Sequence, residues 1–150
     1  MYKENLKNLR ERIGTTQKDI ASMLGIVREA YTQYENEYNT IPLVHLNTIC
    51  DFYNVSLDYI FSFNDLKQYK NTKREIDKKM AGERLKEFRK ENKLTQVKLA
   101  SLLNTTHSVI ADYERGRFLI STSFLYTICK KYKISADYLL GKIDSPKYLK

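Results

Sequence analysis

The chain has 150 residues, of which 26 are Lys or Arg and 18 are Asp or Glu, so its formal net charge is +8. A hydrophobic fraction of 42% with 12 Tyr and 6 Phe excludes a disordered chain. No uncharged apolar run approaches the roughly 18 residues of a membrane-spanning helix. The first residues are polar and charged, which argues against a secretory signal and predicts a cytoplasmic protein. Two cysteines without a CxxC spacing provide neither a disulfide framework nor a zinc motif.

The charge is unevenly distributed along the chain. Residues 1–66 carry 6 basic and 9 acidic side chains, a net charge of −3, whereas residues 67–150 carry 20 basic and 9 acidic ones, a net charge of +11. Such a split indicates two parts with different electrostatic roles. Either the second half binds a polyanion such as nucleic acid, or it is an ordinary basic protein with a solvated lysine-rich stretch.

An internal repeat explains the length of the chain. At an offset of 79 residues, 20 of 58 positions are identical between residues 4–61 and residues 83–140. The matching stretches include Thr16-Gln17 with Thr95-Gln96 and Tyr34-Glu35 with Tyr113-Glu114. The chain therefore contains two copies of one small domain, and the period is too long for a solenoid.

The first copy, residues 5–61, has apolar residues at helical spacing and few turn residues. The clearest stripe is formed by Leu46, Ile49, Cys50 and Tyr53, at i, i+3, i+4 and i+7. Residues 62–81 follow as a linker, of which residues 67–81 carry 6 basic and 2 acidic groups. Its apolar residues recur at steps of three and four, so the linker is either helical or a flexible, solvated connector.

The second copy, residues 82–141, predicts five short helices. A charged helix with Leu85 and Phe88 on one face comes first, and Thr95 then caps a second helix. The third helix runs from Thr106 to Glu114 and stops at Gly116. Ser123 is the expected cap of the fourth helix and Ser135 that of the fifth, which ends at Gly141, before a tail over residues 142–150.

One pattern in both copies resembles a known family. Thr-Gln-x-x-Leu-Ala-x-x-Leu, a tight turn, and a helix ending in Tyr-Glu-Arg-Gly are similar to the lambda-repressor-like (Xre, Cro/cI-type) helix-turn-helix family. The match covers Thr95–Gly116 in copy two and Thr16–Glu37 in copy one. The resemblance implies an all-α fold, with two tandem five-helix DNA-binding domains joined by the lysine-rich linker. Small Ala21 and Ala100 would let the third helix approach the second.

The resemblance also implies which residues contact DNA. Gln17 and Gln96, at the start of the second helix, would hold a phosphate and steady the first base-contacting side chain. Early residues of the third helix would contact base edges, where Arg28 suits guanine and Gln33 suits adenine. Arg115 and Arg117 flank the end of that helix and would meet phosphates. The full predicted set is Thr16, Gln17, Arg28, Glu29, Gln33 and Asn36 in copy one and Thr95, Gln96, Thr106, His107, Ser108, Asp112, Arg115 and Arg117 in copy two.

The same resemblance implies an ion pair between the first and third helix of each copy. The partners are Arg10 with Glu35 and Arg89 with Glu114, which recur at the same offset. The planar guanidinium fork suits a carboxylate, so the pair is expected to lock the two helices together. The alternative is an ordinary surface ion pair worth less than about 1 kcal/mol.

The two copies differ at positions that matter for DNA. Val27 stands where copy two has the capping Thr106, and Glu37 stands where it has Gly116. Copy two, with a net charge of +7 over residues 82–150, is therefore expected to bind DNA more strongly. Copy one is expected either to bind DNA weakly or to contact a protein.

The predicted function is that of a sequence-specific, double-stranded-DNA-binding transcriptional regulator, a repressor rather than an enzyme, with no cofactor, metal or small-molecule ligand. The alternative is a protein-interaction or antitoxin-like module. A homodimer is expected to bind a palindromic site through its two C-terminal copies, and a single-chain pseudo-dimer is the alternative. Apolar residues near the fifth helices are either its interface or core: Ile60, Phe61, Phe63, Leu139 and Leu140.

Overall fold

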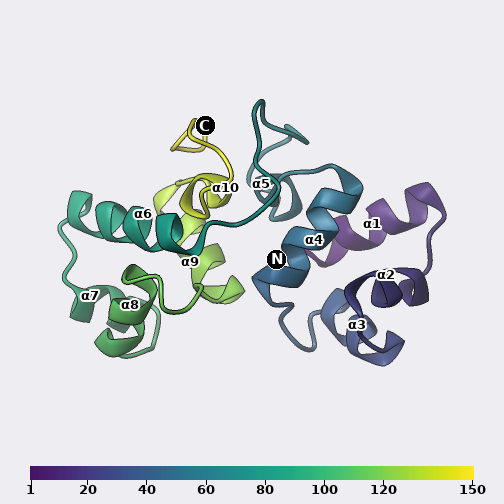
Figure 1. The fold of residues 1–150 in the computed structure, drawn as a ribbon, viewed down its shortest axis with the longest axis horizontal. Helices are drawn as coiled ribbons and strands as arrows, with labels where there is room; N and C mark the ends of the chain where they lie inside the picture. Colours follow the sequence, from purple (N-terminus) through teal and green to yellow (C-terminus); the bar gives the residue numbers. More distant parts are fainter. The chain divides into compact units, whose positions relative to one another are not determined.

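The computed structural model describes all 150 residues and is all-helical, with ten helices in two units (Figure 1). Unit 1 is Met1–Tyr69 and unit 2 is Lys70–Lys150. The only β-type pairing is an isolated bridge between Ile134 and Tyr148. The predicted all-α class with five helices in each copy is confirmed. None of the ten helices combines the length and the apolar character that crossing a membrane requires.

Unit 1 contains five helices whose ends follow from local sequence. Thr16 and Asp19 form a reciprocal capping box at the second helix, and Gly14 and Gly25 end the first two helices in the left-handed conformation. Val27 precedes the third helix and makes no side-chain capping bond, because its apolar side chain has no hydrogen-bond acceptor. The helices are α1 Lys3–Ile13, α2 Gln17–Leu24, α3 Arg28–Glu35, α4 Leu43–Tyr53 and α5 Leu57–Ile60.

Unit 2 repeats this order with two departures from the sequence prediction. Ser121, not Ser123, caps the fourth helix, by accepting a hydrogen bond from the Phe124 amide. Thr106 stands at the N-cap position of the third helix, but its side chain makes no capping bond there. The helices are α6 Lys78–Glu91, α7 Gln96–Leu102, α8 His107–Glu114, α9 Thr122–Tyr132 and α10 Ala136–Leu139.

Each unit has its own apolar core, built from the stripes that the sequence predicts. Ile49 and Cys50 of α4 and Ile128 and Cys129 of α9 are fully buried. Four of the five residues suggested as a dimer interface are also core, with exposures of 3% or less: Ile60, Phe61, Leu139 and Leu140. The fifth, Phe63, is half-buried, and its ring lies 5.5 Å from that of Phe61. Of the two alternatives for these side chains, the structure therefore shows core for the four buried ones, because the hydrophobic effect already buries them inside each unit.

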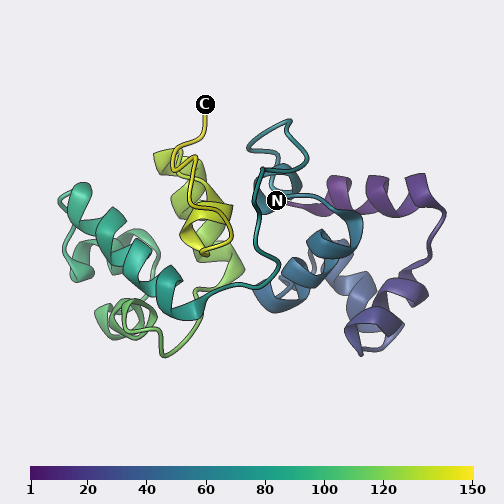
Figure 2. The same ribbon diagram turned by 45° about the horizontal axis from the view of Figure 1, so that its top comes forward.

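The segment predicted as a linker is divided between the two units. Residues 62–69 fold back on unit 1, where the Ser56 amide donates to the Lys67 carbonyl at 2.6 Å and the Tyr69 hydroxyl donates to Asp58 at 2.6 Å. Residues 70–77 contain no helix (Figure 2) and are tied to unit 2, since the Asp77 amide donates to the Leu140 carbonyl. Only residues 78–81 are helical, as the first turn of α6.

The C-terminal tail repeats this fold-back in unit 2. The Ser135 amide donates to the Lys147 carbonyl at 2.8 Å, as the Ser56 amide does to Lys67. Ser62 and Gly141, which open the two segments, are both left-handed. Asp65 matches Asp144 and Tyr69 matches Tyr148 at the offset of 79 residues. The structural repeat therefore extends beyond the helices, to residues 69 and 148.

Candidate nucleic-acid interface

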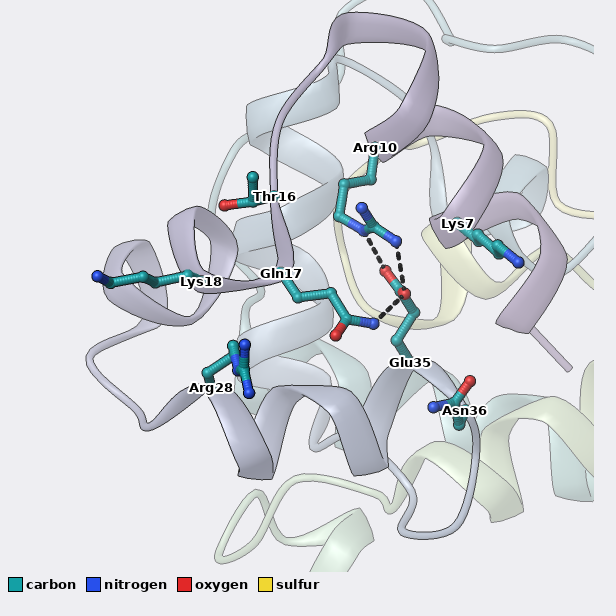
Figure 3. A pocket seen from close by; sticks show the side chains of 8 residues that line it. All are labelled: Lys7, Arg10, Thr16, Gln17, Lys18, Arg28, Glu35 and Asn36. Atoms are coloured by element: carbon teal, nitrogen blue, oxygen red, sulfur yellow. Dashed lines mark hydrogen bonds and ion pairs between the residues drawn. The ribbon is translucent and has the colours of Figure 1, made fainter.

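A buried carboxylate joins the first three helices of unit 1 (Figure 3). Glu35, at the end of α3, is 2% exposed and accepts two bonds from Arg10 of α1, at 2.9 and 3.1 Å. Gln17 of α2 donates to the same carboxylate at 2.7 Å, and the Tyr31 hydroxyl donates at 3.1 Å. The pair is thus a bidentate, buried one rather than a surface contact, and it fixes α3 against the start of α2.

Electrostatics in this network favour the charged carboxylate. Burial by itself raises the pKa of Glu35, but the hydrogen bonds from Arg10, Gln17 and Tyr31 outweigh it, so the pKa lies below its ordinary value. Burial raises the pKa of the Tyr31 hydroxyl, and the neighbouring Glu35 charge raises it further. The network therefore holds an ionised glutamate beside a protonated tyrosine.

Gln17 has both ends of its amide engaged inside the protein. Its Nε2 donates to Glu35, and its Oε1 accepts from the Thr32 hydroxyl of α3 at 2.8 Å. The resemblance implies a glutamine that touches phosphate and the first base-contacting side chain. In the structure Gln17 contacts Thr32 and Glu35 of α3, and these bonds fix the start of α2 against that helix.

Unit 2 contains the same pair with fewer partners. Arg89 binds Glu114 through two bonds of 2.7 and 3.0 Å, and the two side chains are 11% and 4% exposed. Gln96 donates to Glu114 at 3.2 Å. Ile110 replaces Tyr31 and has no hydroxyl to add. The arrangement of α6, α7 and α8 is therefore the same, with one fewer hydrogen bond on the carboxylate.

A hollow of about 640 Å³ lies beside the buried pair of unit 1 (Figure 3). Its lining combines α1, the start of α2 and both ends of α3, and it is rich in cations and amides. The lining residues are Lys7, Arg10, Thr16, Gln17, Lys18, Arg28, Glu35 and Asn36. Four cations face one carboxylate that Arg10 already pairs, so this face is locally basic although the copy as a whole carries −3.

Lys7 and Lys18 were missed by the sequence reasoning. Lys7 precedes Arg10 by three residues on α1 and Lys18 follows Gln17, and both are exposed. Helical spacing places side chains three apart on one face, so the pattern Lys7–Arg10 was a usable signal. The net charge of −3 over residues 1–66 did not reveal this local cluster of cations.

The first turn of each third helix is open to solvent. Arg28 and Glu29 of α3 and His107 and Ser108 of α8 are all exposed. An α-helix fits the major groove of DNA, where side chains of its first turn reach base edges. Arginine can donate two bonds to guanine, and His and Ser can each donate or accept.

Asp112 and Gln33, both predicted to contact bases, are hydrogen-bonded to the loop that follows their helix. Asp112 accepts from Arg115 at 2.6 Å and lies 3.8 Å from Arg117. Gln33, at the equivalent position, accepts from the Asn39 side chain. Arg115 and Arg117 remain 66% exposed, so both cations at the end of α8 stay accessible although Asp112 lies beside them.

Comparison with known proteins agrees with this geometry. One helix-turn-helix family model matches residues 6–60, and a second, described as a helix-turn-helix domain, matches residues 82–145. The chain belongs to the lambda-repressor-like helix-turn-helix family of transcriptional regulators and contains two tandem copies of its domain.

Three relatives illustrate the similarity. The uncharacterized HTH-type transcriptional regulator YobD of Bacillus subtilis (strain 168) is 33% identical over 88 residues, which are 59% of this chain and 70% of that protein. The immunity repressor protein of Bacillus phage phi105 is 41% identical over 61 residues, 41% of this chain and 42% of the repressor. Antitoxin PezA of Streptococcus pneumoniae serotype 4 is 30% identical over 63 residues, 42% of this chain and 40% of PezA. The chain thus spans less than half the length of the last two.

Proposed function

We propose that the chain is a sequence-specific, double-stranded-DNA-binding transcriptional repressor in which both copies contact DNA. The observation that carries the proposal is the exposed first turn of α3 and α8, each held by a buried Arg–Glu pair beside exposed cations. Rigid support fixes the helix backbone before binding, so only the exposed side chains have to be ordered on DNA. The similarity to the phage repressor supports repression as the outcome.

Unit 2 is the stronger DNA-binding copy in this proposal. Its loop after α8 carries Arg115 and Arg117, whereas the equivalent residues of unit 1 are Asn36 and Tyr38. Unit 1 contributes through the basic hollow around Lys7, Lys18 and Arg28. Backbone contacts of this kind supply most of the salt-dependent affinity.

The base-contacting residues differ between the copies, so we propose that the two half-sites differ in sequence. Arg28 and Glu29 in unit 1 correspond to His107 and Ser108 in unit 2. One chain binding two unequal half-sites is favoured over the palindrome-binding homodimer, because four of the five apolar residues suggested as its interface are core. The molar mass of the complex on a selected site tests this: one chain per site is expected, and two chains would restore the homodimer.

Substitutions at exposed positions test the assignment of contacts. Arg117→Ala should weaken binding to all duplex sequences, because it removes a phosphate contact. His107→Ala should change the preferred bases of one half-site, and Arg28→Ala those of the other. Lys133→Ala, a change of an exposed residue at the end of α9, is the control and should do neither. An unchanged preference in both His107→Ala and Arg28→Ala would contradict the assigned base contacts.

One observation favours a second candidate, in which unit 1 contacts a protein. Unit 1 exposes Val44 at 64% and Phe52 at 48%, two turns apart on α4. Unit 2 has Ser123 and Lys131 at those positions. If Lys18→Ala and Arg28→Ala leave DNA affinity and preference unchanged while Arg117→Ala does not, unit 1 acts as the protein-contact module.

A further inference from the structure

The first turn of α6 lies against the end of α8, next to the arginine-bearing loop of unit 2. A Cβ built on Gly82 would lie 2.4 Å from the Tyr113 carbonyl oxygen, so the two helices meet there with no room for a side chain. One turn earlier on α6, a Cβ built on Gly116 would lie 3.2 Å from the Lys79 Cα. Backbone contact thus places Lys79 directly beside the residue that separates Arg115 from Arg117.

Lys78 belongs to the same corner. It lines a small hollow with Tyr113 of α8 and with Phe118, which follows Arg117 in the loop. Lys78 and Lys79 are both exposed. With Arg115 and Arg117 they form a basic corner of four cations, in which the Asp112 carboxylate lies beside the two arginines.

The equivalent corner of unit 1 has the opposite character. Glu37 takes the left-handed position of Gly116, and its carboxylate accepts from the Tyr2 amide at the start of α1, at 3.0 Å. An acid therefore joins the loop to the first helix in unit 1, whereas a glycine backbone with flanking cations does so in unit 2. The two corners therefore differ in charge, acidic in unit 1 and basic in unit 2.

We infer that the first turn of α6, through Lys78 and Lys79, is an additional DNA-backbone contact that extends the arginine loop of unit 2. The inference rests on the proposed function and adds a phosphate-contacting element to it. Its ligand is the phosphodiester backbone, because the ammonium groups of exposed lysines recognise charge rather than base edges. The contact adds affinity to every duplex sequence and leaves base preference to α8.

The test removes two charges at the corner and two elsewhere. In the full chain, Lys78→Gln with Lys79→Gln is compared with Lys130→Gln and Lys131→Gln, which removes two exposed lysines from α9 of the same unit. Binding to a labelled duplex is measured over a range of salt concentrations. Each lost phosphate contact lowers the slope of log affinity against log salt by about 0.9. For the corner variant, the magnitude of this slope should therefore fall by between about 1 and 2, with unchanged base preference. The variant with Lys78→Arg and Lys79→Arg keeps both charges and should have the wild-type slope.

The outcomes separate this inference from the proposed function. A steep slope in the wild-type chain, with equal slopes in the two double variants, would overturn the basic-corner contact alone. Wild-type protein that fails to bind duplex DNA at low salt would overturn the proposed function and the contact with it. A changed base preference in the corner variant would also contradict a backbone contact.

Discussion

At the scale of single residues, one buried carboxylate in each unit links the third helix to the first and second helices. Glu35 and Glu114 each receive a bidentate arginine from the first helix and an amide bond from the second. Removing one partner of such a pair leaves a charge without compensation in a desolvated site, which costs far more than a surface pair contributes.

Arg10→Ala should therefore destabilise unit 1 by about 3 to 5 kcal/mol, because it strands the Glu35 carboxylate. Denaturant unfolding followed at unit 1 measures the loss. Arg12→Ala, a change of an exposed arginine on the same helix, is the matched control and should stay within about 0.5 kcal/mol. Equal effects of the two substitutions would show that the buried pair contributes no more than a surface charge.

Two buried tyrosines and one half-buried tyrosine should make unit 1 sensitive to alkali. Burial raises the pKa of Tyr2 and of Tyr53 to about 12, and it raises that of Tyr31 as well. Unfolded tyrosine ionises near pH 10, so this stabilisation is complete below about pH 10 and is lost as the pH rises through 12. Unit 2 has Ala81 and Ile110 in place of Tyr2 and Tyr31.

Methyl NMR signals of Ile49 and Ile128 report on the two cores separately during a pH titration. The signal of Ile49 should lose its native position between about pH 10 and 12, before that of Ile128. Loss of both signals at one pH, or of Ile128 first, would contradict the role assigned to the tyrosines.

At the scale of elements, the close contact of α6 with α8 is what most distinguishes unit 2. Gly82→Ala should lower the stability of unit 2 by about 1 to 3 kcal/mol, because the added methyl meets two backbone oxygens that cannot move independently. Helix propensity alone predicts the opposite sign, a gain of about 1 kcal/mol. Thermal unfolding of unit 2 decides between them. Glu83→Ala, at the exposed neighbouring position, is the control, and a stabilised Gly82→Ala variant would refute the close contact.

The sequence predicted the helices well and the fold-back segments poorly. Helices were predictable because identical residues recur at helix caps and at buried positions of the two copies. Examples are Thr16 with Thr95 at the caps and Cys50 with Cys129 in the core. The fold-back segments share only scattered identities such as Tyr69 with Tyr148, and their hydrogen bonds are made by backbone groups. Backbone pairing leaves little trace in side-chain identity, so residues 62–69 were taken for a linker.

The candidate site was predictable in part for a related reason. A family resemblance carried the positions of the Arg–Glu pairs and of the exposed first turns. It could not supply the hydrogen bonds of Asp112 and Gln33, because those depend on Arg115 and Asn39 in loops peculiar to each copy. Nor could charge summed over a copy predict the hollow around Lys7 and Lys18, since a surface potential depends on which face carries the charge.

At the scale of the whole molecule, the two copies have the same buried support for the third helix, but they differ in the exposed residues of its first turn and in the charge of the loop after it. A chain built in this way should bind duplex DNA with strong salt dependence. Contact with about six phosphates gives a slope of log affinity against log salt near −5. A shallow slope in the wild-type chain would indicate that its cations do not contact the backbone.

The most direct test of the account is selection of bound sequences from random duplex DNA by the purified full chain. We expect a recovered consensus with two half-sites of different sequence, one altered by Arg28→Ala and the other by His107→Ala. Recovery of sequences no different from the starting pool would contradict sequence-specific binding, and a perfect palindrome altered only by His107→Ala would contradict the role of unit 1.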